Sequence, residues 1–250
     1  MTSFNEELAY YDKFLKEHPE DNVISKEEVI KRLEKGEPIQ YILGEINFYG
    51  YPIKINNNVL IPRFETELLV EKTINKIKKY FPNQTLDILD MGTGSGCIAI
   101  SLKHNLPSAN IFALDISKEA LSIAKKNAFD NNTNITFIES DMTTYKDKLY
   151  DVIISNPPYI SYEEPIMDLV KNNEPHLALY AKDNGLYFYK KIIDNIEYIT
   201  KDKYLICFEI GYNESTAIVD YVNSKLTNLN IYVEKDYSLK DRFIFITNIN

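Results

Sequence analysis

The segment LDILDMGTGSGCIAI, residues 86–100, constrains the fold more than any other stretch of the sequence. An apolar run typical of a buried strand precedes Gly92, Gly94 and Gly96, and an apolar helical pattern follows them. Glycines let a backbone turn sharply and approach a ligand closely, while the N-terminus of the next helix offers unpaired N–H groups. This order of strand, loop and helix predicts a ligand-binding turn in a parallel α/β sheet.

The pattern that follows the glycine loop alternates between strands and helices. Such alternation predicts βαβ units, and therefore an α/β fold with a doubly wound, mostly parallel sheet. We expect strands at 86–91, 111–115, 135–139, 150–155 and 204–209, helices at 96–104, 118–129, 186–199 and 215–226, and a closing antiparallel hairpin at 231–234 and 242–247.

The sequence before this sheet predicts two further parts. Residues 1–36 predict a small helical domain of two amphipathic helices, in which Ser25 caps the second because Glu28 follows three residues later. Residues 37–64 are rich in Ile, Tyr and Phe between glycine and asparagine turn signals, and they predict a linking β-hairpin. A helix over 65–79 then opens the remaining domain, residues 65–250.

Composition limits the partners that such a chain can have. No apolar run is long enough to span a membrane, and the N-terminus lacks the layout of a secretory signal, so we expect a cytoplasmic protein without a membrane partner. A net charge of −9 opposes binding to a phosphate backbone, so we do not expect direct contact with nucleic acid. Cys97, Cys207 and the dispersed histidines form no ligand motif, and we expect no metal.

Details of the glycine loop indicate which nucleotide it binds. The dinucleotide fingerprint requires a glycine where Cys97 stands, which weakens a prediction of NAD binding. Asp90, two residues before Gly92, would repel a pyrophosphate but can pair with an ammonium group. The pattern is similar to the first motif of the class I S-adenosylmethionine-dependent methyltransferases, whose cofactor carries an amino acid in place of a pyrophosphate.

Three further residues complete the predicted cofactor site beside Gly92, Thr93, Gly94, Ser95 and Gly96. Asp115 closes the next strand, about 20 residues beyond the loop, where a carboxylate can accept from both ribose hydroxyls. The alternative role for Asp115 is to cap the helix at Ser117. Asp141 can accept from the adenine amino group, and Met142 can pack on the adenine ring, although simple core packing is the alternative for Met142.

The stretch DVIISNPPYI, residues 151–160, ends a strand with two prolines that can neither extend it nor donate to it. Ligands of an open α/β sheet bind beyond the carboxyl ends of its strands, so this segment should face the cofactor's methyl group. We expect the side-chain oxygen of Asn156 and the carbonyl of Pro157 to accept both hydrogens of a planar –NH₂ group and to stabilise the charge that develops on it. Pro158 adds rigidity, and the ring of Tyr159 can cover the group.

This site alone leaves two substrates open, a carboxamide and the amino group of a base. Several separated motifs, however, resemble those of the HemK-type peptide chain release factor glutamine methyltransferases, from about residue 37 to residue 250. They are EPIQYILGEINFYG, VLIPRFETELLV, DMGTGSGCIAIS, SNPPYI, EPHLALYAKDNGLYFYKKI, FEIGYNES and KDRFIFI.

The resemblance implies a class I methyltransferase that uses S-adenosylmethionine, releases S-adenosylhomocysteine and has a class 1 release factor as its protein partner. It implies methylation of the glutamine amide nitrogen in the Gly-Gly-Gln loop of that factor. The catalytic role, with contacts to both substrate and cofactor, is carried over to Asn156. Substrate binding is carried over to Asn156, Pro157, Pro158 and Tyr159, and cofactor binding to residues 92–96.

The chain departs from this family at two places. The family usually reads Pro-Arg-Pro-Glu/Asp-Thr-Glu, whereas Phe64 stands here at the second proline, and we assign no catalytic role to Arg63, Glu65, Thr66 or Glu67. The N-terminal helical domain is also shorter than is usual.

Three alternatives remain open. A glutamine methyltransferase acting on a ribosomal protein would share the same chemistry. An adenine methyltransferase acting on DNA or RNA would need base flipping, and the acidic balance opposes it, as does the lack of an obvious target-recognition insertion. A cofactor-binding protein without catalysis would have no need of Asn156.

Overall fold

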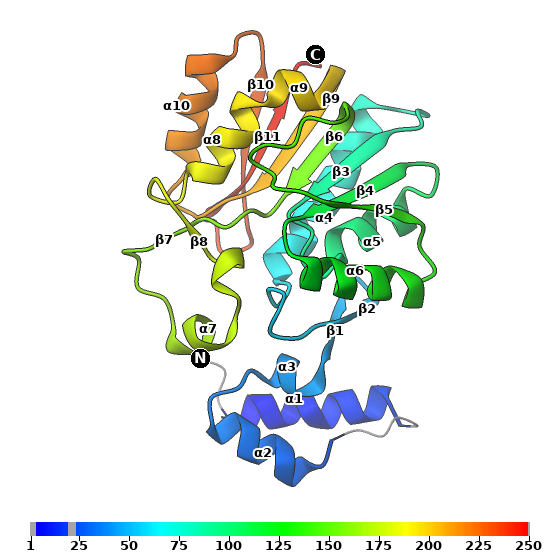
Figure 1. Ribbon diagram of the computed structural model, residues 1–250, viewed down its shortest axis with the longest axis vertical. Coiled ribbons are helices and arrows are strands. Elements are labelled where there is room, and N and C mark those ends of the chain that lie inside the picture. Colours follow the sequence, from blue (N-terminus) through cyan, green and yellow to red (C-terminus); the bar gives the residue numbers. More distant parts are fainter. Residues whose placement is uncertain (1–3, 20–23, 250) are drawn as a thin grey trace.

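The computed structural model describes residues 4–19 and 24–249. Helices α1 (Phe4–Glu17), α2 (Lys26–Glu34) and α3 (Ile39–Leu43) pack together at one end of the molecule (Figure 1). Their shared core contains Tyr11, Val29 and Ile42. The predicted cap is confirmed, because the Ser25 hydroxyl accepts from the Glu28 amide. Residues 1–3 and 20–23 of the predicted helical domain lie outside the described residues.

A β-hairpin connects these helices to the sheet, as predicted, although it is shorter than residues 37–64. Strands β1 (Glu45–Phe48) and β2 (Tyr51–Lys54) pair antiparallel. The short helix α3 precedes them and was not predicted, because its five residues are too few to show a helical period. The hairpin is joined to helix α6 (Lys118–Asp130) by Asn127, whose side chain bonds to both the N–H and the carbonyl of Lys54.

The central sheet confirms the predicted fold class. Its strand order is β10-β11-β9-β6-β3-β4-β5. Strands β3, β4, β5, β6 and β9 are parallel to one another, and β10 and β11 form the antiparallel hairpin at one edge. The bounds are β3 (Asp87–Met91), β4 (Asn110–Asp115), β5 (Ile135–Glu139), β6 (Tyr150–Ser155), β9 (Thr200–Glu209), β10 (Asn230–Lys235) and β11 (Asp241–Thr247).

Helices cover both faces of this sheet (Figure 1). Alternate residues of one strand enter different cores: Ile88 packs beneath α4 (Phe64–Tyr80), α5 (Cys97–Asn105) and α6, whereas Leu89 packs beneath α8 (Tyr187–Asp194), α9 (Ile196–Ile199) and α10 (Ser215–Lys225). The prediction of one helix over 186–199 is wrong. Asn195 separates α8 from α9, and its side chain donates to the carbonyl of Thr143.

A long excursion between β6 and α8 was not predicted, because no periodic pattern marks its short elements. It contains β7 (Ile160–Ser161), α7 (Asp168–Asn173), the 3₁₀ turn η1 (His176–Ala178) and β8 (Tyr180–Ala181), with β7 parallel to β8. Asn173 donates from this excursion to the carbonyl of Gly36, next to α2. The excursion therefore reaches from the carboxyl end of the sheet to the N-terminal helices.

None of the helices in the described part of the chain combines the length and the apolar character that a membrane span requires.

Candidate active site

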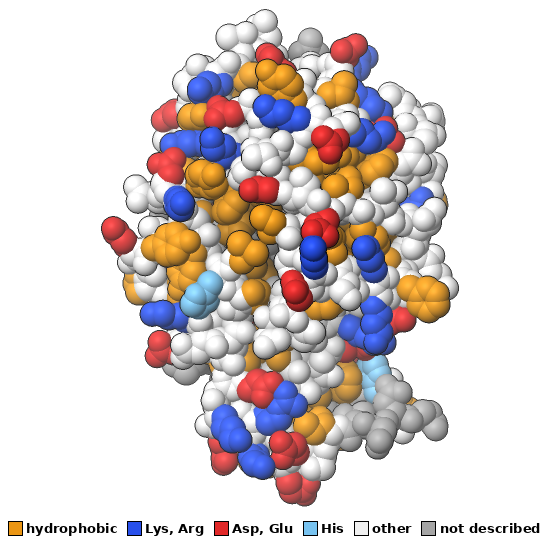
Figure 2. Space-filling model, in the orientation of Figure 1, with side chains coloured by type: hydrophobic (Ala, Val, Ile, Leu, Met, Phe, Trp, Pro, Cys, Tyr) orange, Lys and Arg blue, Asp and Glu red, His pale blue; other side chains and the backbone are white. Residues whose placement is uncertain are grey.

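A cavity of about 380 Å³ lies at the carboxyl ends of the parallel strands. The chain runs outward from β3 through β4 to β5 and then returns to β6 on the other side of β3, so the gap between β3 and β6 is the topological switch point where α/β sheets bind ligands. Figure 2 shows hydrophobic side chains gathered near the middle of one face, with charged side chains of both signs around them.

The predicted site residues after β3, β4, β5 and β6 converge on this cavity. Those that line it are Gly92, Thr93, Gly94, Ser95, Asp115, Asp141, Met142, Asn156 and Pro158. Gly96, Pro157 and Tyr159 are not among its lining residues.

The glycine loop is tightly packed on two sides. Gly92 has a φ of +83°, a backbone conformation that other residues rarely adopt, and a Cβ there would lie 2.8 Å from Cε at the end of the Met142 side chain, which would have to shift. Gly96 also has a φ of +83°, and a Cβ there would lie 3.1 Å from Cβ of Ala124 on α6. Gly96 therefore serves helix packing at the start of α5, rather than forming a wall of the cavity.

Asp115 joins the glycine loop to the turn after β4. Its Oδ2 accepts from the Gly94 amide at 2.8 Å, and its Oδ1 accepts from the Ser117 amide at 2.9 Å. Burial raises the pKa of Asp115, and the backbone hydrogen bonds oppose that rise. The cap of α6 is Ser117, whose hydroxyl accepts from the Ala120 amide. Because a carboxylate can accept about four hydrogen bonds, Asp115 retains capacity for a ligand's hydroxyls.

Asp141 and Met142 form the wall beyond β5. Asp141 accepts through Oδ1 from both the amide and the hydroxyl of Thr143, at 2.7 Å each. The end of the Met142 side chain lies close to Gly92, and Met142, which is partly buried, packs against one of the two cores of the sheet. Core packing, the alternative for Met142, is thus observed, and its place in the cavity lining leaves packing on an adenine ring as a prediction.

Asp90 lies beneath the loop and does not line the cavity, which differs from its predicted contact with an ammonium group. It is fully buried, and its Oδ2 accepts from the Thr93 hydroxyl at 2.6 Å and from the Ala99 amide at 3.2 Å. Burial raises the pKa of Asp90 to about 7. The carboxyl group therefore stabilises the loop from below.

Two buried polar atoms at the glycine loop have no hydrogen-bond partner. Within the described residues, Asp90 Oδ1 and Ser95 Oγ are buried and make no hydrogen bond. A buried polar atom without a partner costs about 1–3 kcal/mol. Because Ser95 lines the cavity, its unpaired hydroxyl fits a loop that receives a polar ligand such as a nucleoside linked to an amino acid.

Asn156 lines the cavity at the end of β6, next to β3 in the sheet. Its Nδ2 donates to the Thr66 hydroxyl at 3.1 Å, and within residues 4–19 and 24–249 no hydrogen bond reaches its Oδ1. Ser155, just before it, donates to the carbonyl of Met91 at 2.5 Å and so ties the end of β6 to the end of β3. A carboxamide with its oxygen unused is thus presented beside the glycine loop.

Tyr159, whose ring is predicted to cover the substrate's planar group, is not among the residues that line the cavity. The ring packs against the core beneath α8, and burial raises the pKa of its hydroxyl. Tyr187 and Phe188, at the start of α8, line the cavity instead. Sequence reasoning missed them, although they stand in the quoted motif that ends GLYFYKKI, because nothing in their spacing indicated a binding role.

Other lining residues, to which the sequence assigned no binding role, come from the linker, the excursion, the starts of α4, α5 and α6, and the turns after β4 and β5. They are Asn57, Asn58, Val59, Leu60, Pro62, Thr66, Cys97, Ile98, Ile116, Ser117, Ala120, Thr143, Pro175, Leu177 and Ala178.

Arg63 and Glu174 join the linker to the excursion, two segments that both contribute residues to the cavity lining. The Arg63 guanidinium donates to Glu174 Oε1 at 2.5 Å, and Glu174 Oε2 accepts from the Ile61 amide at 3.2 Å. Glu67, three residues after the start of α4, accepts from the Tyr49 amide in the hairpin. These contacts give a structural role to residues without a catalytic assignment, since they hold separate motifs together.

In the described part of the chain, no group of three or more His, Cys, Asp or Glu side chains is arranged to hold a metal ion.

The cavity lies at the switch point of the sheet. It has a glycine loop and a carboxylate on one side and a rigid Asn-Pro-Pro segment on the other. This is the arrangement of a class I methyltransferase. A family model described as "Methyltransferase small domain" matches residues 65–178. A methyltransferase from Pyrococcus furiosus superposes with a TM-score of 0.58 at 15% identity, covering 88% of this chain and 98% of that one, which shows the shared fold.

Curated relatives define the family more narrowly. A release factor glutamine methyltransferase of Flavobacterium psychrophilum is 44% identical, over 90% of this chain and 81% of the relative. One of Lactococcus lactis subsp. lactis is 42% identical, over 88% of this chain and 80% of the relative. The chain belongs to the family of release factor glutamine methyltransferases.

Proposed function

We propose that this protein transfers a methyl group from S-adenosylmethionine to the side-chain amide nitrogen of the glutamine in the Gly-Gly-Gln loop of a class 1 peptide chain release factor. Membership of the family supports the reaction and the substrate. The observation that carries the proposal at the site is the Asn156 carboxamide, whose nitrogen is bound to Thr66 and whose oxygen is unused beside the glycine loop.

The chemistry requires help, because the lone pair of an amide nitrogen is delocalised into its carbonyl. S-adenosylmethionine, when bound, supplies an electrophilic methyl whose C–S bond breaks, with both electrons kept by sulfur, as the new N–C bond forms. Asn156 Oδ1 accepts one amide hydrogen, which orients the nitrogen and stabilises the positive charge that develops before the nitrogen loses a proton. The carbonyl of Pro157 is the second proposed acceptor, and Pro158 forms the wall beside it.

On the cofactor side we assign binding to Gly92, Thr93, Gly94, Ser95 and Gly96. Asp115 accepts from the ribose hydroxyls, Asp141 accepts from the adenine amino group, and Met142 packs on the adenine ring. The positions of these side chains around one cavity support this assignment, except for Gly96, which acts through packing at the helix start.

We also infer that the protein acts in the cytoplasm on a protein partner, without direct contact with nucleic acid. Its net charge of −9 supports the absence of direct contact with nucleic acid, and the names of its relatives support a protein partner.

The test supplies the purified protein with S-adenosylmethionine and with a release factor, a ribosomal protein extract or DNA, and locates the added methyl by mass spectrometry. We expect one methyl on the Gly-Gly-Gln glutamine, and none on a release factor in which that glutamine is replaced by alanine. Methylated adenine, or a methylated ribosomal glutamine with an untouched Gly-Gly-Gln loop, would overturn the proposal.

A further inference from the structure

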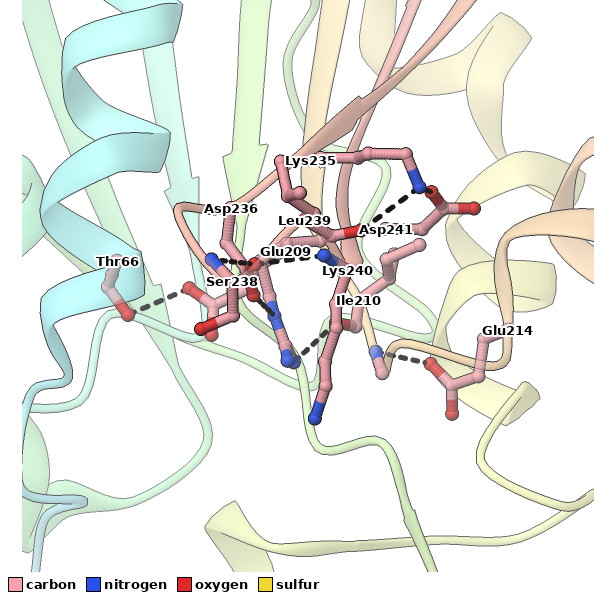
Figure 3. Close-up of polar contacts among 12 residues, drawn as sticks. Thr66, Glu209, Ile210, Glu214, Lys235, Asp236, Ser238, Leu239, Lys240 and Asp241 are labelled. Atoms are coloured by element: carbon pink, nitrogen blue, oxygen red, sulfur yellow. Dashed lines mark hydrogen bonds and ion pairs between the residues drawn. The ribbon is translucent and has the colours of Figure 1, made fainter.

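A buried relay of side chains runs behind Asn156. Thr66, in the first turn of α4, is 3% exposed, and Glu209, the last residue of β9, is 1% exposed. The Thr66 hydroxyl accepts from Asn156 Nδ2 at 3.1 Å and donates to Glu209 Oε2 at 2.8 Å. Figure 3 shows Thr66 and Glu209 facing each other across the gap between α4 and the sheet. The relay therefore joins elements that are far apart in the sequence.

The chemistry of these groups fixes the direction of both hydrogen bonds. An ionised carboxylate only accepts, so the single hydroxyl proton of Thr66 points to Glu209. The lone pairs of Thr66 then face Asn156, which must present its –NH₂ to them and turn its oxygen away. A flipped carboxamide would set two oxygens against each other with no proton between them, and it would offer an –NH₂ to a substrate –NH₂.

We propose that Thr66 and Glu209 are positioning residues that hold the Asn156 carboxamide in the orientation needed to accept from the substrate amide. This inference rests on the proposed role of Asn156 and deepens it. It also gives a purpose to two motifs, VLIPRFETELLV and FEIGYNES, which supply residues for neither the glycine loop nor the Asn-Pro-Pro-Tyr segment.

Charged groups around Glu209 act on its ionisation in both directions. Arg242 on β11 and Arg63 before α4 favour the charged form, whereas Glu65 opposes it. Arg242 is anchored by bonds to the Ile210 carbonyl at 3.0 Å and to the Asp236 carboxylate at 3.3 Å. Tyr159, Tyr189 and Cys97 are further titratable groups close enough to Glu209 to interact with it electrostatically.

Burial dominates over these charges and raises the pKa of Glu209 to about 7. The direction of the two hydrogen bonds at Thr66 determines how turnover should change with pH. Below this pKa the carboxyl group carries a proton and no longer compels Thr66 to donate, so the Asn156 carboxamide loses its fixed orientation. Turnover at saturating cofactor should therefore rise with pH through about 7.

The first test changes Thr66. Thr66→Val keeps the shape but removes the hydroxyl, and we expect turnover at saturating cofactor to fall roughly 10- to 100-fold, as for one lost buried hydrogen-bond partner. Thr66→Ser should restore most of it, and cofactor affinity measured by calorimetry should be unchanged in both. Thr73→Val is the matched control, because Thr73 is buried on the same helix and lies outside the relay. Equal loss in Thr66→Val and Thr73→Val would overturn the proposal.

The second test follows pH. Glu209→Gln should lose the rise in turnover through about pH 7. Glu214→Gln should keep it, because it removes another carboxyl group whose pKa burial raises to about 7 but which bonds to the Gly211 amide, outside the relay. A rise that persists unchanged in Glu209→Gln would overturn the role of the carboxylate.

A third measurement needs no substrate. It can therefore refute the relay without refuting the proposed function. The side-chain –NH₂ signals of Asn156, assigned by their loss in Asn156→Ala, should shift with a midpoint near pH 7 in ¹⁵N-edited NMR spectra. The shift should disappear in Glu209→Gln. Signals that do not move in the unsubstituted protein would refute the relay, whatever substrate the enzyme methylates.

Discussion

The two sides of the cavity are built in different ways. On the cofactor side the bonds are local: Asp115 lies 21 residues from Gly94, and Asp90 lies 3 residues from Thr93. The other side, which binds the substrate that accepts the methyl group, is called the acceptor side. Its hydrogen bonds join distant parts of the chain, since Asn156 lies 90 residues from Thr66 and Thr66 lies 143 residues from Glu209. The cofactor side is thus built by the loops after the consecutive strands β3, β4 and β5, whereas the acceptor side depends on contacts between segments far apart in the sequence.

This difference predicts a separation of effects. Changes on the cofactor side should act mainly on cofactor affinity, and changes on the acceptor side mainly on turnover. The following substitutions test the separation.

The largest effect should come from Asn156→Ala. It removes the acceptor that orients the substrate amide, and loss of one preorganised polar group at a reacting centre costs roughly 10²–10³ in turnover. Cofactor binding should persist, because the glycine loop and Asp115 are untouched. Turnover is measured with a release factor substrate and affinity by calorimetry. Undiminished turnover would mean that the acceptor group is elsewhere.

Gly185→Ala should cause the second-largest loss of turnover, although Gly185 does not line the cavity. Gly185 has a φ of +90°, and a Cβ there would overlap the backbone carbonyl of Tyr159 and the Glu214 carboxylate. The Asn-Pro-Pro-Tyr segment must then shift, and misplacement by about 1 Å can cost roughly 10²-fold in turnover. Cofactor affinity should change little.

Gly36→Ala is the control for this substitution. Its φ of +79° imposes a similar backbone strain of about 1–2 kcal/mol, but a Cβ there meets nothing within 4 Å. Both variants should lose some thermal stability, and only Gly185→Ala should lose turnover. Equal turnover in the two variants would show that close approach to Tyr159 does not matter.

The same contrast explains what the sequence could predict. Alternating strands and helices led to the fold class, and the glycine loop with Asp115 led to one side of the site, because local patterns encode local bonds. The relay from Asn156 to Glu209 was not predicted, since no pattern within a window of residues reveals a hydrogen bond across 143 positions. The place of Tyr187 in the cavity lining, with Tyr159 packed against a core, was not predicted for a related reason: it depends on how the excursion packs.

Asp115→Ala should have a smaller effect than the substitutions above, and it should lower cofactor affinity instead of turnover. The substitution removes the proposed ribose acceptor and the partner of the Gly94 amide. Hydrogen bonds to a charged group contribute about 1.5–3 kcal/mol, so cofactor affinity should fall roughly 10- to 100-fold. Turnover at saturating cofactor should be nearly retained. An equal loss of turnover at saturation would contradict the division between the two sides of the cavity.

The smallest effect should come from Phe64→Pro, which restores the residue that the family usually has. Phe64 is the first residue of α4 and is 60% exposed. Arg63 before it is extended, with φ −99° and ψ 156°, which is the backbone that a residue before proline adopts. Proline is favoured at this helix position, and by restricting the unfolded chain it should add about 0.4–1 kcal/mol to the free energy of unfolding.

The exposed stacking of Phe64 on Tyr237, with ring centroids 6.0 Å apart, offsets part of that gain. Urea denaturation should therefore show a small rise in stability, with turnover and cofactor affinity unchanged. Because Phe64 adjoins Arg63 and lies two residues before Thr66, the result bears on the acceptor side directly. A tenfold loss of turnover in Phe64→Pro would mean that the substrate extends over Phe64 and Tyr237, and that the acceptor side reaches beyond the cavity to this aromatic pair.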